Sequence, residues 1–293
     1  MRGRKLFVIV AGICTILLLS SLMLSAQDKK EKPKGSNFIP SPIFSPVYPP
    51  FPHRFCDMDG VSILCKAPKG AIKRAVMPPL EPAGDEETFV LVLGWTRDVE
   101  KGGYNVHEVA INAPVKWKDK VGNTTLIEYI DSDMGLLAGR EGFGWPKKMA
   151  VITWTNTYTG WMIVVNKMKD QGSVPLMKIE YKIDDSAPEV EWPDMGPTLL
   201  VRRIGPGSLT TKSFNQMICV GCDRPEMSAG PLEAAPGTGS ATRGTATVQF
   251  FDGPHDPLTF LGPTKVLAAK GSSMEGMMPV GLGLGEVLEE WRE

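Results

Sequence analysis

The chain has 293 residues, of which 42% are hydrophobic and 22% are charged, with a formal net charge of −1. Such values are ordinary for a soluble protein. Lys and Arg are interspersed with Asp and Glu, so we expect no concentrated basic face of the kind that binding of a nucleic acid needs. The 31 Gly and 25 Pro favour many turns and short strands over long helices, so we expect a β-rich globular domain.

The N-terminal segment has the features of a secretory signal. Its basic start is followed by an apolar stretch at residues 6–24 and by two small residues, which is typical of an exported protein, either periplasmic or secreted. The apolar stretch is also close to a membrane-spanning length, so an uncleaved anchor that tethers the chain to a membrane is the alternative. We assign residues 1–26 to the signal or anchor, 27–45 to a tether rich in Pro and Lys, and 46–293 to the folded domain.

The pattern of apolar residues predicts strands along most of this domain. Val61–Leu64 is predicted as a short strand, and Lys69–Val76 as a helix with its apolar residues on one face. Further runs of β-branched and aromatic residues, separated by Gly, Pro, Asn and Asp, indicate a meandering antiparallel sheet. These runs are Thr88–Trp95, His107–Pro114, Thr125–Ile130, Ala150–Trp154, Met162–Val165, Leu176–Ile183, Leu199–Arg203, Gln216–Val220 and Thr245–Phe251. A mobile loop is expected between Cys222 and Gly244, and a closing helix near Gly285–Trp291.

A pair of lysines is the most informative feature of the sequence. Ser132–Glu141 is predicted as a short helix with Ser132 as its N-cap, and a turn with Gly and Pro separates it from Lys147 and Lys148, which begin an apolar strand. Neighbouring residues of a strand point to opposite faces, so one lysine is expected to turn inward. Burial of an ammonium lowers its pKa and favours the neutral amine, the form that attacks a carbonyl carbon. The alternative is a pair of solvated lysines beside a turn.

The lysine pair also belongs to a longer motif. Gly139-Arg140-Glu141, followed by an aromatic residue and then by Pro146-Lys147-Lys148, resembles the signature of the acetoacetate decarboxylase family, and segments in the family's order cover most of residues 40–293. The resemblance implies an α+β fold in which a mainly antiparallel β-sheet closes into a barrel-like form with a few short helices and a pocket in the sheet interior. It also implies a homo-oligomer.

The resemblance further implies the chemistry of the pair. Lys147 would form a Schiff base with a small keto acid, and Lys148 would be the neighbouring cation that activates it. This chemistry needs no metal and no organic cofactor. The predicted activity is decarboxylation of a β-keto acid, such as acetoacetate, to a ketone and carbon dioxide.

Other positions of the site follow from the same resemblance. Counted back without a gap from the lysine pair, Glu108 falls where the family has an active-site glutamate, which implies a general acid or base; the alternative is an exposed strand glutamate. Met58 stands where the family has an arginine, with only Arg54 nearby. The family's second glutamate has no counterpart in the strand at Thr88–Leu93. We assign Arg54, Met58 and Trp145 to the substrate-binding part of the site.

The cysteines indicate buried thiols or a structural bridge rather than a metal site. Four of them follow the N-terminal segment, namely Cys56, Cys65, Cys219 and Cys222. Cys219-Val-Gly-Cys222 has the spacing of a redox or metal pair, but a second pair of Cys or His ligands at matching spacing is missing. No metal is therefore expected.

Two alternative functions remain at this stage. The missing arginine affects how a substrate carboxylate is held, so an aldolase or dehydratase that forms a Schiff base with another keto acid is one alternative. A secreted protein that binds a keto acid without turning it over is the other. No Gly-x-Ser-x-Gly elbow is present, and the glycines near residue 283 lack the spacing of a dinucleotide loop.

Overall fold

The computed structural model describes residues 44–48, 55–97, 105–169, 172–206, 211–222, 239–278 and 285–293, which belong to one compact unit, Phe38–Glu293. The predicted signal or anchor, most of the predicted tether and Arg54 lie outside these residues. Among the residues described, no helix is long and apolar enough to cross a membrane.

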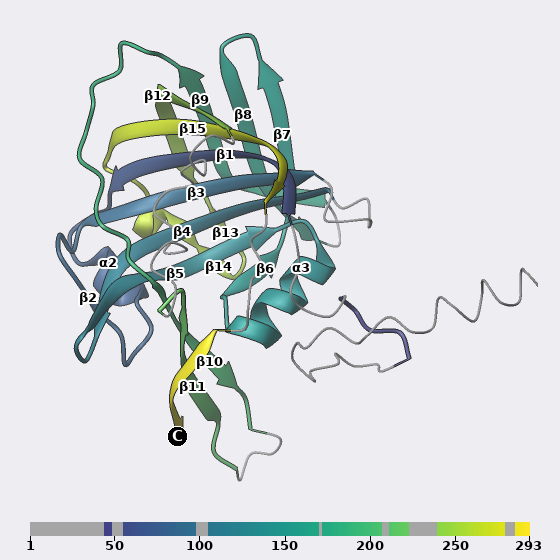
Figure 1. The fold of residues 1–293 in the computed structure, drawn as a ribbon, viewed down its shortest axis with the longest axis vertical. Coiled ribbons are helices and arrows are strands. Elements are labelled where there is room, and N and C mark those ends of the chain that lie inside the picture. Colours follow the sequence, from purple (N-terminus) through teal and green to yellow (C-terminus); the bar gives the residue numbers. More distant parts are fainter. Residues whose placement is uncertain are drawn as a thin grey trace, which may run out of the picture. The chain divides into compact units, whose positions relative to one another are not determined.

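Most of the domain is one large sheet (Figure 1). Its strands are β1 (Phe55–Lys66), β2 (Glu81–Pro82), β3 (Thr88–Arg97), β4 (Asn105–Trp117), β5 (Lys120–Ile130), β6 (Lys147–Met149), β7 (Val151–Thr157), β8 (Gly160–Lys169), β9 (Gly172–Ile183), β10 (Thr198–Ile204), β11 (Phe214–Val220), β12 (Gly239–Phe250), β15 (Lys265–Met278) and β16 (Glu286–Arg292). A separate hairpin pairs β13 (Asp252–Gly253) with β14 (Asp256–Pro257). The helical segments are short, namely α2 (Ala71–Ala75), α3 (Asp133–Leu137), the π-helix η2 (Ala138–Phe143) and the 3₁₀-helix η4 (Leu258–Leu261).

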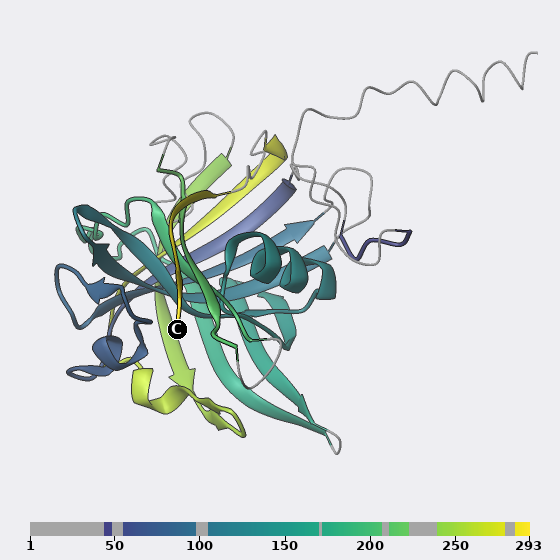
Figure 2. The ribbon, with the colours of Figure 1, turned by 90° about the horizontal axis from the view of Figure 1, so that it is seen from below.

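The strands follow the order β16-β11-β10-β5-β4-β3-β1-β15-β12-β9-β8-β7, with β2 beside β4 and β6 beside β5. Among the strands that the structure describes, only β5–β10 and β5–β6 are parallel pairs. The sheet is strongly curved, as Figure 2 shows. Six strands separate β4 from β7 in the order, yet the rings of His107 in β4 and Trp154 in β7 lie 6.1 Å apart between centroids. The predicted fold, a mainly antiparallel sheet with a few short helices, is confirmed.

The two faces of the sheet bury different side chains. Val109, Ile111 and Ala113 of β4 are fully buried in the largest apolar cluster, to which β1, β3, β5, β8 and β9 also contribute. Because side chains alternate along a strand, Glu108 and Ala110 face the other way. This second face carries the lysine site.

The predicted strands all overlap observed ones, usually with longer observed ends, and the two internal helices are present. Lys69–Val76 contains α2, and Ser132–Glu141 corresponds to α3 and most of η2. The expected loop after Cys222 is shorter than predicted, because β12 already begins at Gly239; residues 223–238 lie outside the described part of the chain.

The predicted closing helix at Gly285–Trp291 is wrong, because this segment is strand β16, paired with β11. Leu288 and Trp291 both pack on the core, and their spacing of three residues is typical of a helix. The register shifts between Met217 and Ile218 of β11, where Val287 and Glu289 of β16 are the partners. Leu288 is thus the extra residue of a β-bulge, which brings a spacing of three onto one face of a strand.

Strand β15 lies between β1 and β12 and is absent from the predicted elements. Its sequence is rich in Ala, Gly, Ser and Met, residue types with little strand preference. The small residues have a packing reason, since a Cβ on Gly271 would lie 2.9 Å from the Tyr181 hydroxyl oxygen. Tertiary packing therefore overrides propensity in this strand.

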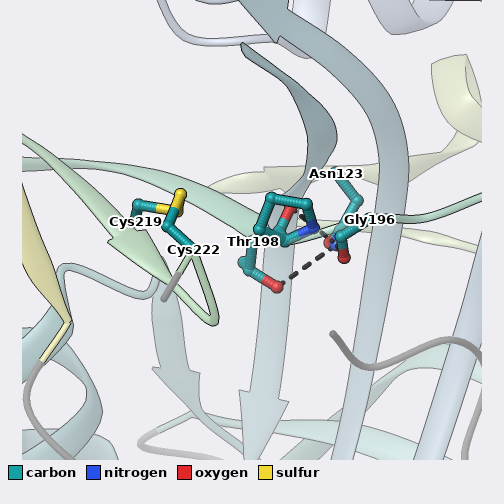
Figure 3. Close-up of a disulfide and its surroundings, with 6 residues drawn as sticks. Asn123, Gly196, Thr198, Cys219 and Cys222 are labelled. Atoms are coloured by element: carbon teal, nitrogen blue, oxygen red, sulfur yellow. Dashed lines mark hydrogen bonds between the residues drawn. A yellow bond between two sulfur atoms is a disulfide. The ribbon is translucent and has the colours of Figure 1, made fainter. Parts of the chain in front are cut away.

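The Cys219–Cys222 pair forms a disulfide at the end of β11, with 5.8 Å between the Cα atoms (Figure 3). The bridge agrees with the structural alternative for this pair and leaves neither sulfur free to bind a metal. Beside it in Figure 3, the side-chain amide of Asn123 donates hydrogen bonds to the Thr198 hydroxyl and the Gly196 carbonyl, at 3.2 Å and 3.4 Å, where β5 meets β10. Cys65 is a buried free thiol, and burial raises its pKa to about 12.

Candidate active site

The lysine site is built on the second face of the sheet by three neighbouring strands. β6 runs parallel to β5 with Lys147 opposite Glu128, so both side chains point to the same face. In the β4–β5 pair Ala110 is opposite Glu128, which makes Glu108 its diagonal neighbour on that face. Sheet register therefore brings together three ionisable side chains that are far apart in the sequence.

Both glutamates contact the ammonium of Lys147. Its Nζ lies 2.5 Å from Glu108 Oε1, 2.9 Å from Glu128 Oε1 and 5.8 Å from the centroid of the Trp145 ring. Lys147 and Glu128 are only 9% and 5% exposed, whereas the Glu108 side chain is 37% exposed. Glu108 therefore lies on the solvent side of the amine and Glu128 on the buried side.

A short helix covers this face (Figure 1). It begins at the predicted cap, where the Ser132 hydroxyl accepts a hydrogen bond of 3.1 Å from the backbone N–H of Gly135, and it continues as the π-helix η2. Gly139 of η2 lies directly on the lysine stem, since a Cβ there would be 2.5 Å from Lys147 Cε and 2.7 Å from Cδ. Only glycine permits this close approach of backbone to the lysine.

The other residues of the motif fix η2 in place. The Arg140 guanidinium donates to the Lys147 carbonyl at 3.0 Å, and the Glu141 carboxylate accepts from the Tyr48 hydroxyl at 3.1 Å. Gly144 ends the π-helix with φ 84°, and a Cβ there would lie 2.7 Å from the Arg202 Cα. Glycine is required at this position for both reasons.

The charges of the cluster differ from those expected. Burial by itself lowers the pKa of Lys147, but the interactions with Glu108 and Glu128 outweigh burial and raise that pKa above its ordinary value. The expectation of a lowered pKa is therefore wrong. Burial raises the pKa of Glu128 to about 8; Glu108 adds to this rise and Lys147 opposes it. At neutral pH the cluster thus contains the Lys147 ammonium and a neutral Glu128 carboxylic acid.

Lys148 points to the opposite face of β6 from Lys147. Its ammonium pairs with the buried carboxylate of Asp256 and donates to the His255 carbonyl at 3.0 Å. Tyr129 donates to the same Asp256 oxygen at 2.7 Å. The predicted inward turn of one lysine is confirmed for Lys147, but the charge of Lys148 is offset by Asp256 and is directed away from Lys147.

Of the predicted substrate-binding residues, Trp145 contacts Lys147, whereas Met58 lies farther along the sheet. Trp145 is part of the cluster through its ring contact with Lys147. Met58 pairs with Thr96 of β3, whose own partner in β4 is Val106, two residues from Glu108. Met58 therefore shares a face with Glu108 but lies two strands away.

The site differs from the expected one in two further ways. The expected pocket lay in the sheet interior, whereas the lysine cluster lies beneath η2, on the face opposite the largest apolar cluster. In addition to Glu108, the site contains Glu128 of β5, a strand in which the sequence had indicated no functional residue. A signal was present, because Leu126, Glu128 and Ile130 share one face of a predicted strand and a carboxylate between two apolar side chains is costly without a partner.

Comparisons with known proteins identify relatives. The family model described as acetoacetate decarboxylase (ADC) matches residues 40–290. Acetoacetate decarboxylase 3 of Mesorhizobium japonicum is 32% identical over 110 residues, and the acetoacetate decarboxylase of Ralstonia nicotianae is 31% identical over 110 residues. Each match covers 37% of this chain, and 41% and 43% of the respective relatives. The chain thus aligns with less than half the length of these relatives.

Solved structures share the fold. Acetoacetate decarboxylase from Legionella pneumophila has a TM-score of 0.64 at 15% identity, covering 90% of this chain and 99% of that one. The enduracididine biosynthesis enzyme MppR, solved with the condensation product of pyruvate and imidazole 4-carboxaldehyde, has a TM-score of 0.58 at 15% identity, covering 85% of this chain and 97% of that one. At such identities the likeness concerns the fold alone.

Proposed function

This chain belongs to the acetoacetate decarboxylase family, and we propose that it is a Schiff-base-forming lyase that decarboxylates a β-keto acid through an imine on Lys147. One observation carries the proposal: a buried amine, on a strand start fixed by the Gly139-Arg140-Glu141 motif, contacts two carboxyl groups. An ion pair kept only for stability has little reason to be arranged in this way, because burying three ionisable groups together is costly.

The amine becomes nucleophilic by a proton transfer within the cluster. Lys147 is an ammonium at neutral pH, and Glu108 at 2.5 Å is placed to take one of its protons. The neutral amine then attacks the ketone carbon, and loss of water gives a protonated imine. The imine carries one of the three ammonium protons and the water takes the other two, so formation of the imine changes no net proton count.

The protonated imine is an electron sink. The carbon–carbon bond to the substrate carboxylate breaks, its electrons enter the imine, and carbon dioxide leaves an enamine behind. Protonation of the enamine carbon and hydrolysis release the ketone and restore Lys147. Lys148, bound to Asp256, contributes by anchoring β6 and not by perturbing the amine.

An aldolase or dehydratase acting on another keto acid is the second candidate. Met58 stands where the family resemblance calls for an arginine, and the groups that contact Lys147 Nζ in the described residues are acidic or aromatic. Within the described residues, which do not include Arg54, a substrate carboxylate would thus find no cation in contact with the amine. The MppR structure holds a condensation product of pyruvate, which supports carbon–carbon bond formation as an alternative outcome of the same imine.

Borohydride reduction tests the imine. We expect a covalent adduct on Lys147, assigned by peptide mass mapping, when the protein is reduced in the presence of acetoacetate, pyruvate or another small keto acid. Lys147→Ala should abolish the adduct, and Lys182→Ala, which removes a lysine exposed in β9, should leave it unchanged. An adduct only on other lysines, or none with any keto acid, would favour the non-catalytic binding protein.

A further inference from the structure

The buried glutamate has no role in the reaction as described above, yet it touches the reacting nitrogen. Glu128 lies in β5 directly opposite Lys147, with Oε1 2.9 Å from Nζ. The residue is 5% exposed, so water reaches it poorly. A buried carboxyl group that contacts a nucleophilic amine is a candidate for proton transfer.

We propose that Glu128 is the acid that protonates the enamine carbon, whereas the more exposed Glu108 is the base that deprotonates Lys147. This assignment rests on the proposed Schiff-base function and divides between two residues the acid and base work that the sequence had indicated for Glu108 alone. Two carboxyl groups in different surroundings can take opposite roles in one site.

Geometry distinguishes the two glutamates. Glu108 makes the shorter contact with Nζ and is the partly solvated carboxyl group of the pair, so it is placed to accept a proton and exchange it with water. Glu128 lies on the buried side of the amine. The enamine carbon is two bonds from Nζ, so an oxygen 2.9 Å from Nζ is within reach of that carbon.

The protonation state of Glu128 agrees with its role as the acid of the pair. Burial, with a contribution from Glu108, raises the pKa of Glu128 to about 8, so this carboxyl group retains its proton at neutral pH. A neutral acid can donate, whereas a carboxylate that pairs with an ammonium cannot. The two charged groups that interact with Glu128 are Lys147 and Glu108.

The proposed step is balanced. The enamine π electrons form the new C–H bond with the Glu128 proton, the nitrogen lone pair restores the C=N double bond, and Glu128 becomes a carboxylate. Hydrolysis of the imine returns Lys147 as an ammonium without a net change in protons. Glu128 then takes one proton from solvent, which is the proton that decarboxylation of a keto-acid anion consumes.

Hydrogen–deuterium exchange on a simple ketone isolates this step. In deuterium oxide, acetone would form the imine on Lys147, and each conversion of imine to enamine and back would replace a methyl hydrogen by deuterium. Proton NMR measures the rate of this exchange. Borohydride trapping of acetone on Lys147 measures imine formation separately. Glu128→Gln is the decisive variant, because the amide copies the size and neutrality of the protonated acid but cannot transfer a proton. Glu180→Gln, a glutamate paired with Lys182 on β9, is the matched control.

We expect Glu128→Gln to trap acetone on Lys147 in a yield close to that of the unaltered protein, while its exchange rate falls about 100-fold. Removal of a methyl hydrogen from the imine needs Glu128 as a carboxylate, so exchange by the unaltered protein should rise as pH rises toward about 8, the pKa of Glu128, and the variant should lack that rise. Undiminished exchange in Glu128→Gln would overturn the proposal, and so would loss of trapping in a variant that keeps its thermal stability, because Glu128 would then serve imine formation. Absence of trapping in the unaltered protein would instead remove the Schiff-base function itself.

Discussion

Gly139→Ala should disable the amine without removing any charged group. The new Cβ would lie 2.5 Å from Lys147 Cε and 2.7 Å from Cδ, whereas carbon atoms pack at about 3.5–4.0 Å. The lysine stem must therefore move by roughly 1 Å, which takes Nζ out of its contacts with Glu108 and Glu128. A misplacement of about 1 Å at a reacting group can cost about 100-fold in rate.

The assay is the rate of borohydride trapping on Lys147 together with kcat/KM for a keto acid, and thermal unfolding shows whether the variant folds. We expect both rates to fall by about 100-fold while the folded protein persists. Gly205→Ala is the matched control, because nothing lies within 4 Å of a Cβ at that position. Trapping within about twofold of the unaltered protein in a folded Gly139→Ala variant would refute the close approach of η2 to the lysine.

The remaining predictions concern the disulfide, the N-terminus and the dependence of stability on pH. Replacing Cys219 and Cys222 together with Ser should lower the free energy of unfolding by about 2 kcal/mol, the loop-closure value for so short a loop, and leave turnover intact; loss of turnover in a folded variant would give the bridge a role in the site. N-terminal sequencing of the native protein should begin near residue 27, as expected for a cleaved export signal, and an intact Met1 in a membrane fraction would indicate an anchor, whereas recovery from the cytosol would contradict export. The free energy of unfolding should fall as pH rises from the ordinary pKa of a glutamate toward about 8, because Glu128 keeps its proton in the folded chain and loses it in the unfolded chain. Glu128→Gln should flatten this slope in chemical denaturation, and an unchanged slope would contradict the raised pKa.

Local patterns predicted most of the sheet and failed where tertiary structure changes the pattern. Runs of β-branched and aromatic residues predicted β4 and β5, and the predicted strands His107–Pro114 and Thr125–Ile130 lie inside the observed ones. The closing helix was predicted wrongly, because a β-bulge at Leu288 places Leu288 and Trp291 on one face of strand β16 at a spacing typical of a helix. β15 was not predicted, because it is rich in small residues, which have little strand preference. One of them, Gly271, packs against Tyr181 so closely that a larger side chain would not fit.

The sequence was sufficient to predict a buried lysine at the site, but not the partners of that lysine or the direction of its pKa shift. Alternation along the strand predicted that one lysine of the pair is buried, and the resemblance carried by the motif around Gly139 selected Lys147. The pairing of Lys147 with Glu128 depends on the parallel register of β5 and β6, which no local pattern determines. The pKa of a buried amine follows from such partners as much as from burial, and for this reason the sequence indicated its direction wrongly.

The central claim, that turnover passes through an imine on Lys147, has one direct test in water enriched in the heavy oxygen isotope. Hydrolysis of an imine places a solvent oxygen in the ketone, so every molecule of acetone formed from acetoacetate by this protein should carry the heavy isotope, as measured by mass spectrometry at times short enough to exclude exchange of free acetone. Lys147→Ala should form acetone no faster than buffer alone. Acetone that retains the original ketone oxygen while carbon dioxide is released would contradict the account.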